Sequence, residues 1–201
     1  MSNRFGQAYG LTTISPIING RTDGVHHAQE LRAILASLPR GQRSPFALVD
    51  GTHTARWFVV DDLVSEAIPG REDHLNSKYL VFIADFDGPL EQYVSSLVAA
   101  IPDVIDSVWS HCVGYPGSRK PLAVLDYIRD CQVDTTLYFG GYPGATVEAA
   151  LRALFVQRSM IEFIEESRHL PSGELQSSIS KRPARLMMSA WRGSIASSLN
   201  K

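Results

Sequence analysis

The spacing of apolar residues in the first 60 positions predicts strands and helices in alternation. Residues 9–18 are rich in β-branched side chains and predict a strand that ends at an Asn-Gly turn. Apolar residues then recur at helical spacing over residues 25–38 and predict a helix. Residues 46–49 predict a short strand, and residues 55–60 predict a longer one that can start as early as His53.

The middle of the chain contains its most continuous apolar run. Residues 79–86 (YLVFIADF) are apolar almost throughout, which is typical of a central strand covered on both faces. A turn at residues 87–89 then opens a helix over residues 90–101. Pro102 breaks or kinks this helix, and the apolar face continues to residue 112.

Three more elements are predicted towards the C-terminus. Residues 122–131 predict a helix, and residues 135–139 (TTLYF) predict a strand. Thr146 is a suitable N-cap for a long helix that ends before Pro171. The side chains expected to point inward from this helix are Val147, Ala150, Leu151, Leu154, Phe155 and Ile161.

Without the inserted helix and the last helix, this order is βαββαβ, the ferredoxin-like pattern. The predicted fold class is therefore α+β, with an antiparallel sheet and helices on one face. The other face needs a cover, and a second copy packed across a two-fold axis supplies one, so a homodimer is expected. We predict one domain over residues 1–169 and a tail over residues 170–201.

Composition and charge narrow the function classes. The 201 residues (22.2 kDa) suffice for one buried core, and the net charge of −2 gives no general attraction to nucleic acid or to an anionic membrane. No apolar run approaches the ~20 residues that cross a bilayer. The first residues lack a secretory apolar core, and two cysteines are too few for a disulfide scaffold, so a cytoplasmic location is expected. Five basic residues against one acidic residue give the tail a net charge of +4.

The densest chemistry lies at the end of the helix after Pro102. Trp109, His111, Cys112 and Tyr115 fall within one helical turn and the Gly-Tyr-Pro-Gly turn that follows it. One interpretation makes His111 an axial ligand of a haem (heme) iron. The alternative is a histidine that hydrogen-bonds the free carbonyl groups at a helix end. For Cys112 the alternatives are a thiolate ligand or a buried apolar filler.

A second group of polar residues lies on the strand over residues 55–60. In an extended chain Arg56 shares a face with Thr54, whereas His53 and Trp57 share the other. An unpaired charge is too costly to bury in an apolar strand. Arg56 is therefore interpreted either as a clamp for a carboxylate, a haem propionate or a peroxide, or as a structural partner of Asp61, Asp85 or Asp87.

Other candidate motifs have simpler explanations. Asp85 and Asp87 lack further acidic residues at calcium-loop spacing, so helix capping explains them better. His26 and His27 project about 100° apart on a helix and cannot easily share one metal ion. The sequence contains no dinucleotide fingerprint, P-loop, zinc-protease motif or nucleophile elbow, which disfavours nucleotide-dependent enzymes and zinc hydrolases.

The element order, the broken second helix ending in Trp109-Ser110-His111 and the aromatic-rich strand give the chain a family resemblance. Over roughly residues 9–167 it resembles the dimeric α+β barrel superfamily. That superfamily includes haem-degrading monooxygenases, cofactor-free antibiotic-biosynthesis monooxygenases, chlorite dismutase-like and dye-decolourising peroxidases, and aldoxime dehydratases. The distal Gly-x-x-Asp-Gly motif of the peroxidases is missing, which argues against a straightforward peroxidase.

The resemblance implies a site between helices and sheet. His111 would be the metal ligand, with Trp109 beside the cofactor and with Arg56 and His53 as distal polar groups. The Ser-rich end of the tail also resembles the C-terminal peptides that load cargo into encapsulin shells. The alternatives for the tail are disorder or packing on a dimer partner.

The resulting functional prediction is an oxidoreductase, haem-dependent, that acts on a small organic substrate with oxygen or peroxide. A second possibility keeps the barrel without haem. His53, Arg56 and Tyr115 would then perform acid–base chemistry in a monooxygenase, isomerase or dehydratase. A third is a non-catalytic dimeric module that binds a ligand.

Overall fold

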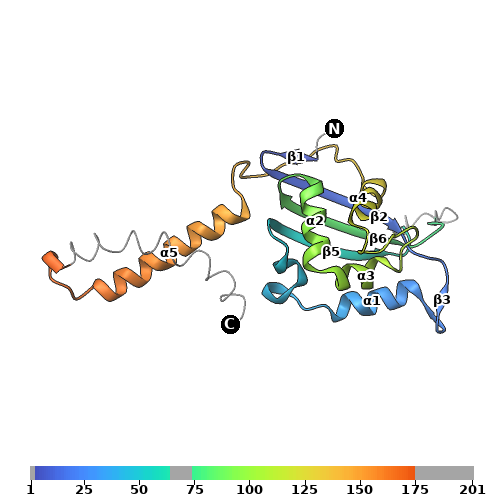
Figure 1. Cartoon of the computed structure of the whole chain (residues 1–201), viewed down its shortest axis with the longest axis horizontal. Helices are drawn as coiled ribbons and strands as arrows, with labels where there is room; N and C mark the ends of the chain where they lie inside the picture. Colours follow the sequence, from blue (N-terminus) through green and yellow to red (C-terminus); the bar gives the residue numbers. More distant parts are fainter. Residues whose placement is uncertain (1–2, 64–73, 175–201) are drawn as a thin grey trace, which may run out of the picture. The chain divides into compact units, whose positions relative to one another are not determined.

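Four strands form one antiparallel sheet, and its two central strands carry most of the pairing. In the computed structural model, which describes residues 3–63 and 74–174, the sheet order is β1-β2-β6-β5. Figure 1 shows the strands, which are β1 (Arg4–Phe5), β2 (Ala8–Pro16), β5 (Thr52–Val60) and β6 (Tyr79–Asp87). β6 pairs antiparallel with both β2 and β5, so β2 and β5 run parallel with β6 between them.

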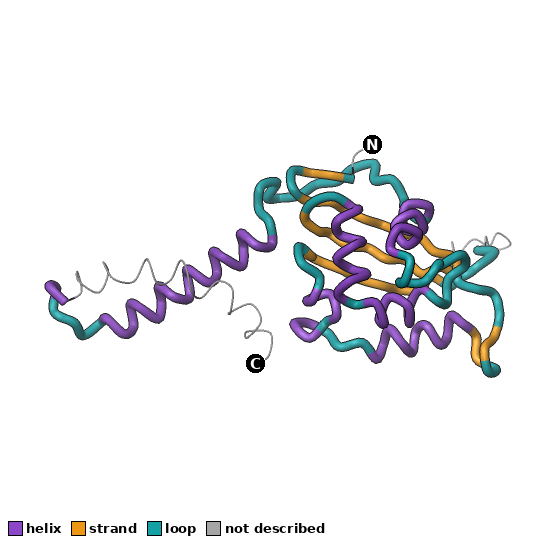
Figure 2. The backbone as a smooth tube through the Cα atoms, in the orientation of Figure 1, coloured by secondary structure: helices purple, strands orange, loops and turns teal. Residues whose placement is uncertain are grey.

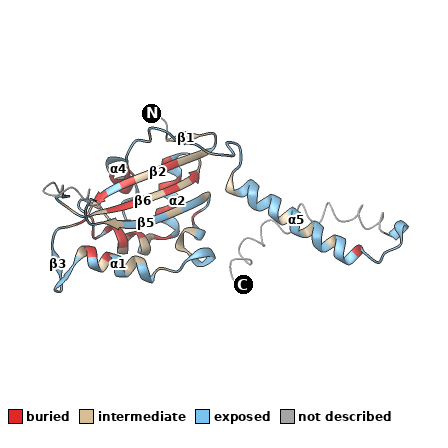
Figure 3. Cartoon of the chain, turned by 180° about the vertical axis from the view of Figure 1, so that it is seen from behind, coloured by how far each residue is buried: buried red, intermediate tan, exposed pale blue. Residues whose placement is uncertain are grey.

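Side chains alternate between a helix-covered face and an open face of this sheet. On β6 the even positions from Leu80 to Phe86 are completely buried. In the register of the sheet Trp57 lies opposite Phe82, and both point to the covered face, whereas Arg56 lies opposite Ile83 on the open face. Seen from behind, none of the helices described between residues 3 and 144 lies in front of the strands (Figure 3).

Helices pack on the covered face of the sheet (Figure 2). They are α1 (His27–Ser37), α2 (Leu90–Ala100), α3 (Pro102–Trp109) and α4 (Pro121–Asp130). α1 contacts β5 and α3, and α2 contacts α3 and α4. A hairpin of β3 (Arg21–Thr22) and β4 (Val25–His26) precedes α1, and two 3₁₀ turns, η1 (Gly41–Arg43) and η2 (Pro45–Leu48), follow it.

Aromatic rings fill the space between the helices and the sheet. Trp109 is completely buried, and its ring centroid lies 5.5 Å from that of Trp57 and 5.3 Å from that of Phe82. Phe46 of η2 completes the group, 4.5 Å from Trp57. Burying side chains of this size contributes about 1.5–3 kcal/mol each. This cluster is the core of the sheet unit.

Most of the predicted elements are present. The strands predicted at residues 9–18 and 79–86 are confirmed, as is the helix over residues 90–101, which is followed at once by a second helix beginning at Pro102. The prediction of a strand at residues 46–49 is wrong, because Pro45–Leu48 form a 3₁₀ turn. On the open face of β6 Val81 is buried and Ile83 and Asp85 are half-buried, so no residue of this strand is fully exposed.

The strand predicted at residues 135–139 does not form either. Only an isolated bridge joins Gln132 to Thr13 at this edge of β2. β1 already occupies the edge of β2 further along, where Arg4 pairs with Tyr9. Asn3 of the same segment also binds the backbone of Thr135 with its side chain, at 2.7 Å. Strand β1 therefore occupies the part of the β2 edge with which residues 135–139 would have to pair.

The chain divides into two compact units, Met1–Gly144 and Ala145–Lys201, so the division falls before the boundary predicted at residue 169. In the second unit α5 (Val147–Ser167) begins at the predicted cap, since Thr146 Oγ1 accepts a hydrogen bond from Ala149 N at 3.1 Å. The expectation of inward-pointing residues is wrong for four of them, which are exposed: Ala150, Leu151, Leu154 and Ile161. The expected encapsulin-type peptide lies outside the described residues.

Within the described ranges, no helix is long and apolar enough to cross a membrane.

Candidate functional site

A β-bulge places His53 on the open face of the sheet. The pairing of β5 with β6 shifts between Thr52 and Thr54, so that His53 is an extra residue in the strand. Its Nε2 lies 2.9 Å from Asp87 Oδ1, and about a third of its side chain is exposed (32%). When Nε2–H of the neutral ring donates a hydrogen bond to the carboxylate, the other ring nitrogen keeps its lone pair. The bulge therefore provides an oriented imidazole.

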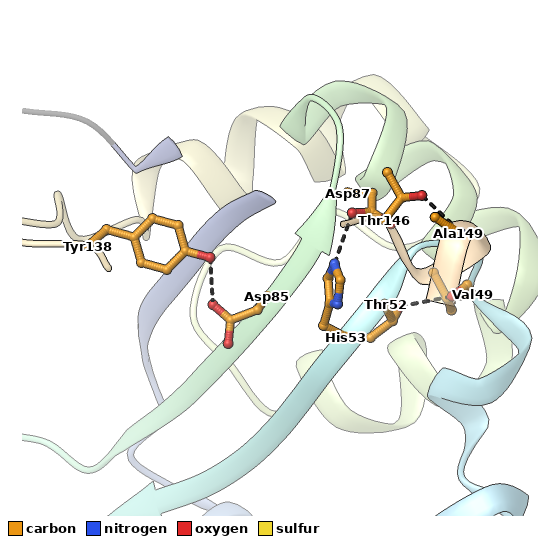
Figure 4. Close-up of polar contacts among 8 residues, drawn as sticks. All are labelled: Val49, Thr52, His53, Asp85, Asp87, Tyr138, Thr146 and Ala149. Carbon is orange, nitrogen blue, oxygen red and sulfur yellow. Dashed lines mark hydrogen bonds and ion pairs between the residues drawn. The ribbon is translucent and has the colours of Figure 1, made fainter. Parts of the chain in front are cut away.

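A second carboxylate lies beside this pair on the open face (Figure 4). Thr54 Oγ1 donates to Asp85 Oδ2 at 2.8 Å, and the hydroxyl of Tyr138 donates to Asp85 Oδ1 at 3.3 Å. Burial, with the negative charge of Asp85 as a smaller cause, raises the pKa of Tyr138 above its usual value. Tyr138 therefore stays a neutral hydrogen-bond donor.

Arg56 lies further along the same face and is exposed. The alternative interpretation, that Arg56 is a structural partner of one of three nearby aspartates, is wrong. Asp61 pairs instead with Arg32 and Lys78, Asp85 bonds Thr54 and Tyr138, and Asp87 binds His53. Nothing in the part of the chain that the structure describes pairs with the guanidinium of Arg56, which leaves it available to bind an anion.

An apolar row also crosses the open face. Ile14, Val81 and Phe58 form one row across three strands, and Ile14 and Phe58 are each 41% exposed. The next row consists of Thr12, Ile83 and Arg56. The open face thus combines a polar end, a cationic centre and an apolar end, a combination that suits an organic anion with an apolar body.

Trp109 and Tyr115 lie on the covered side, away from this face. Tyr115 donates its hydroxyl to Asp106 Oδ1 at 2.7 Å, and its ring packs near Trp109. Burial, followed by the hydrogen bond to Asp106 and then by the charge of that carboxylate, raises the pKa of Tyr115 far above its usual value. A phenol held in this way is a poor proton carrier near neutral pH, and its contacts are those of a structural residue.

His111 faces His27 rather than a carbonyl group. The two Nδ1 atoms are 3.0 Å apart, and His111 is buried with 8% of its surface exposed. Its pKa is lowered chiefly by burial, while Glu30 acts in the opposite direction. In residues 3–63 and 74–174, this pair included, no three histidine, cysteine or acidic side chains are placed to hold one metal ion.

The packing between the helices and the sheet bears on the haem site expected at His111. A porphyrin ligated by this histidine needs an open space between helices and sheet, whereas the rings of Trp109, Trp57 and Phe82 fill that space. Trp57 belongs to the covered face and its neighbour Arg56 to the open face, so Arg56 and Trp109 lie on opposite sides of the sheet. His53 and Arg56 therefore cannot be distal groups over a cofactor held at Trp109 and His111 in the same protomer.

The structure brings His53 and Arg56 together and separates them from His111, Trp109 and Tyr115. The sequence did not predict the contact of Asp87 with His53, since Asp87 was interpreted as a helix cap. It gave no indication of Tyr138 as a site residue. The two-residue spacing of Asp85 and Asp87 was a usable signal, since it places both carboxylates on one face of a strand. The bulge at His53 left no such signal.

Comparison with models of known families, with curated proteins and with solved structures finds no match to this chain in any of the three. The function must therefore be argued from the residues themselves.

Proposed function

We propose that this protein is an enzyme of the dimeric α+β barrel type that transfers a proton on a small organic anion bound to the open face of its sheet. The observation that carries the proposal is the His53–Asp87 pair, 2.9 Å apart, on the same face as an Arg56 without a described partner. In this proposal the protein needs no bound cofactor. Among the haem-free enzymes considered from the sequence, the proposed enzyme is the isomerase.

The roles follow from the geometry. Arg56 binds the carboxylate of the substrate through its planar fork of N–H groups. His53 lies three residues away along the strand, about 10 Å, which is the span of a small aromatic acid. Its free nitrogen takes a proton from the carbon next to a carbonyl group and returns it to the enolate oxygen. Asp87 stabilises the imidazolium that forms between the two transfers.

Several features support the barrel part of the proposal. β2, α1 and β5 form a β-α-β unit with β6 inserted antiparallel between the two strands, as in a ferredoxin-like fold. The fourth strand of that pattern would lie beside β2, where β1 and the Gln132 bridge now lie. A second copy placed on the open face would exclude water from the site and cover the exposed apolar row.

Keto–enol exchange of phenylpyruvate tests the proposal, since this molecule combines a carboxylate, an acidic carbon and an aromatic body. The decay of the enol's ultraviolet absorbance is measured with the purified full chain. We expect His53→Gln to lower kcat/KM by about 10²–10⁴-fold, as for the loss of a general base. We expect Arg56→Gln to raise KM by about 10–100-fold, since it removes a charge-assisted hydrogen bond.

Arg40→Gln is the matched control, because Arg40 is exposed and lies outside the open face. Equal activity of the His53→Gln variant and the unchanged chain would refute the proposed base. Binding is measured separately as a rise in melting temperature with phenylpyruvate. A rise that depends on Arg56, without any turnover, would replace the enzyme by the non-catalytic binding module.

A further inference from the structure

Two imidazoles far apart in the sequence meet at the edge of the helix layer. His27 is the first residue of α1, and His111 lies two residues beyond the end of α3. Their Nδ1 atoms face each other at 3.0 Å. Without an ion between them, only one of these nitrogens can carry the shared proton, because two N–H groups would repel each other at this distance.

The separation is close to that of two nitrogens bound to one metal ion. With metal–nitrogen bonds of 2.0–2.1 Å and a tetrahedral angle, two ligand nitrogens are about 3.3 Å apart. A movement of a few tenths of an ångström at the two rings is therefore sufficient. The first ring can supply it, since His27 is only partly buried and begins its helix.

The surroundings of the pair favour a cation. Thr22 Oγ1 lies 3.3 Å from Nε2 of His27, and when this hydroxyl accepts a hydrogen bond from Nε2–H, Nδ1 keeps its lone pair. Glu30, one turn further along α1, acts on His111 with its negative charge. The neighbouring His26 turns away and binds Arg21, with 3.0 Å between the two nitrogens.

We propose that His27 and His111 bind one divalent transition-metal ion, such as Zn²⁺, with water in the remaining positions and Glu30 as the nearby compensating charge. Such an ion would join the start of α1 to the end of α3. This site is independent of the open face and of the proposed proton transfer.

Metal titration of the full chain, freed of metal with a chelator, tests the site. Cobalt(II) is added as a spectroscopic probe, and a visible absorption typical of low coordination, saturating at one ion per chain, is expected. Zinc(II) at 100 times its dissociation constant is expected to raise the melting temperature by about 5–10 °C. His27→Gln and His111→Gln should each remove both signals.

Control variants separate this site from other effects. His26→Gln should retain both signals, because His26 binds Arg21 and not the pair. His53→Gln should also retain them, while His27→Gln should leave phenylpyruvate turnover unchanged. If the His111→Gln variant does not fold, the cobalt absorption and the zinc stabilisation of the His27→Gln variant test the site. Absence of the cobalt absorption, or equal zinc stabilisation in the His27→Gln variant, would overturn the proposal and leave the pair as a shared-proton hydrogen bond.

Discussion

At the scale of single residues, Asp106 shows how a polar group can organise the chain inside the helix layer. It accepts three hydrogen bonds, from the Tyr115 hydroxyl at 2.7 Å and from Ser118 N and Oγ at 2.8 and 2.6 Å. Burial alone would raise the pKa of Asp106, but the bonds from Ser118 and Tyr115 outweigh it and hold that pKa below its usual range. The ionised carboxylate therefore fixes the Gly-Tyr-Pro-Gly turn to α3.

Replacing this carboxylate should destabilise the fold measurably. We expect Asp106→Ala to lower the free energy of unfolding by about 2 kcal/mol in urea titrations, because Ser118 and Tyr115 lose their acceptor. Asp134→Ala, an exposed residue with no described contact, is the control and should change it by less than about 0.5 kcal/mol.

The effect of Asp106 should depend on pH in a defined direction. Its pKa is lower in the folded chain, so its contribution is complete above the ordinary aspartate pKa of about 3.9. It is lost as the pH falls through the lowered folded value. The difference between the unchanged chain and Asp106→Ala should therefore shrink below about pH 4. A difference that grows on acidification would contradict this account.

At the scale of elements, the β1–β2 turn explains why one predicted strand is missing. Gln7 N donates to Pro143 O at 2.9 Å, and Gly88 N donates to Gln7 O at 3.0 Å. Gly6 has a φ of 62°, and a Cβ on it would lie 1.9 Å from Pro143 O. The turn thus holds the backbone of residues 140–144 in close contact. The path of this backbone differs from that of a regular edge strand.

Substitution of two glycines can separate this contact from backbone strain. Gly24→Ala meets nothing within 4 Å but also has a positive φ of 84°, so we expect a loss of about 1–2 kcal/mol from strain alone. Gly6→Ala should cost at least about 2 kcal/mol more, because the chain must move away from Pro143. Equal losses in thermal unfolding would show that the Pro143 contact contributes nothing.

At the scale of the whole molecule, the open face and α5 both expose apolar residues. Phe58 and Ile14 are exposed on the sheet, and α5 exposes Leu154 and Ile164 among others. Exposed apolar groups of this kind mark interaction surfaces. The proposed homodimer would cover the sheet face with the same face of a second copy.

Sedimentation velocity of the full chain tests the homodimer. We expect a dimer for the unchanged chain and a shift towards monomer for Phe58→Glu, because a charge cannot be buried unpaired between two sheets. Leu48→Glu is the control, since Leu48 is 62% exposed and belongs to η2 rather than to the open face. An unchanged dimer in Phe58→Glu would place the interface elsewhere.

The sequence by itself determined the elements whose signal is local. The apolar run at residues 79–86 and the stripe of residues 90–101 predicted β6 and α2, because side-chain periodicity follows from backbone geometry. It also identified His53, Arg56 and His111 as unusual in their surroundings. It could not tell which of them share a face, since that depends on strand register, on the bulge at His53 and on competition for an edge.

Tertiary structure alone decided which polar groups meet. Asp87 lies 34 residues from His53 in the chain, and His27 lies 84 residues from His111, yet each pair is in hydrogen-bond contact. Such pairs arise when sheet pairing and helix packing fix distant backbones together, and local periodicity carries no record of them. For this reason the sequence supplied the chemical groups, and the fold divided them between the two sides of the sheet.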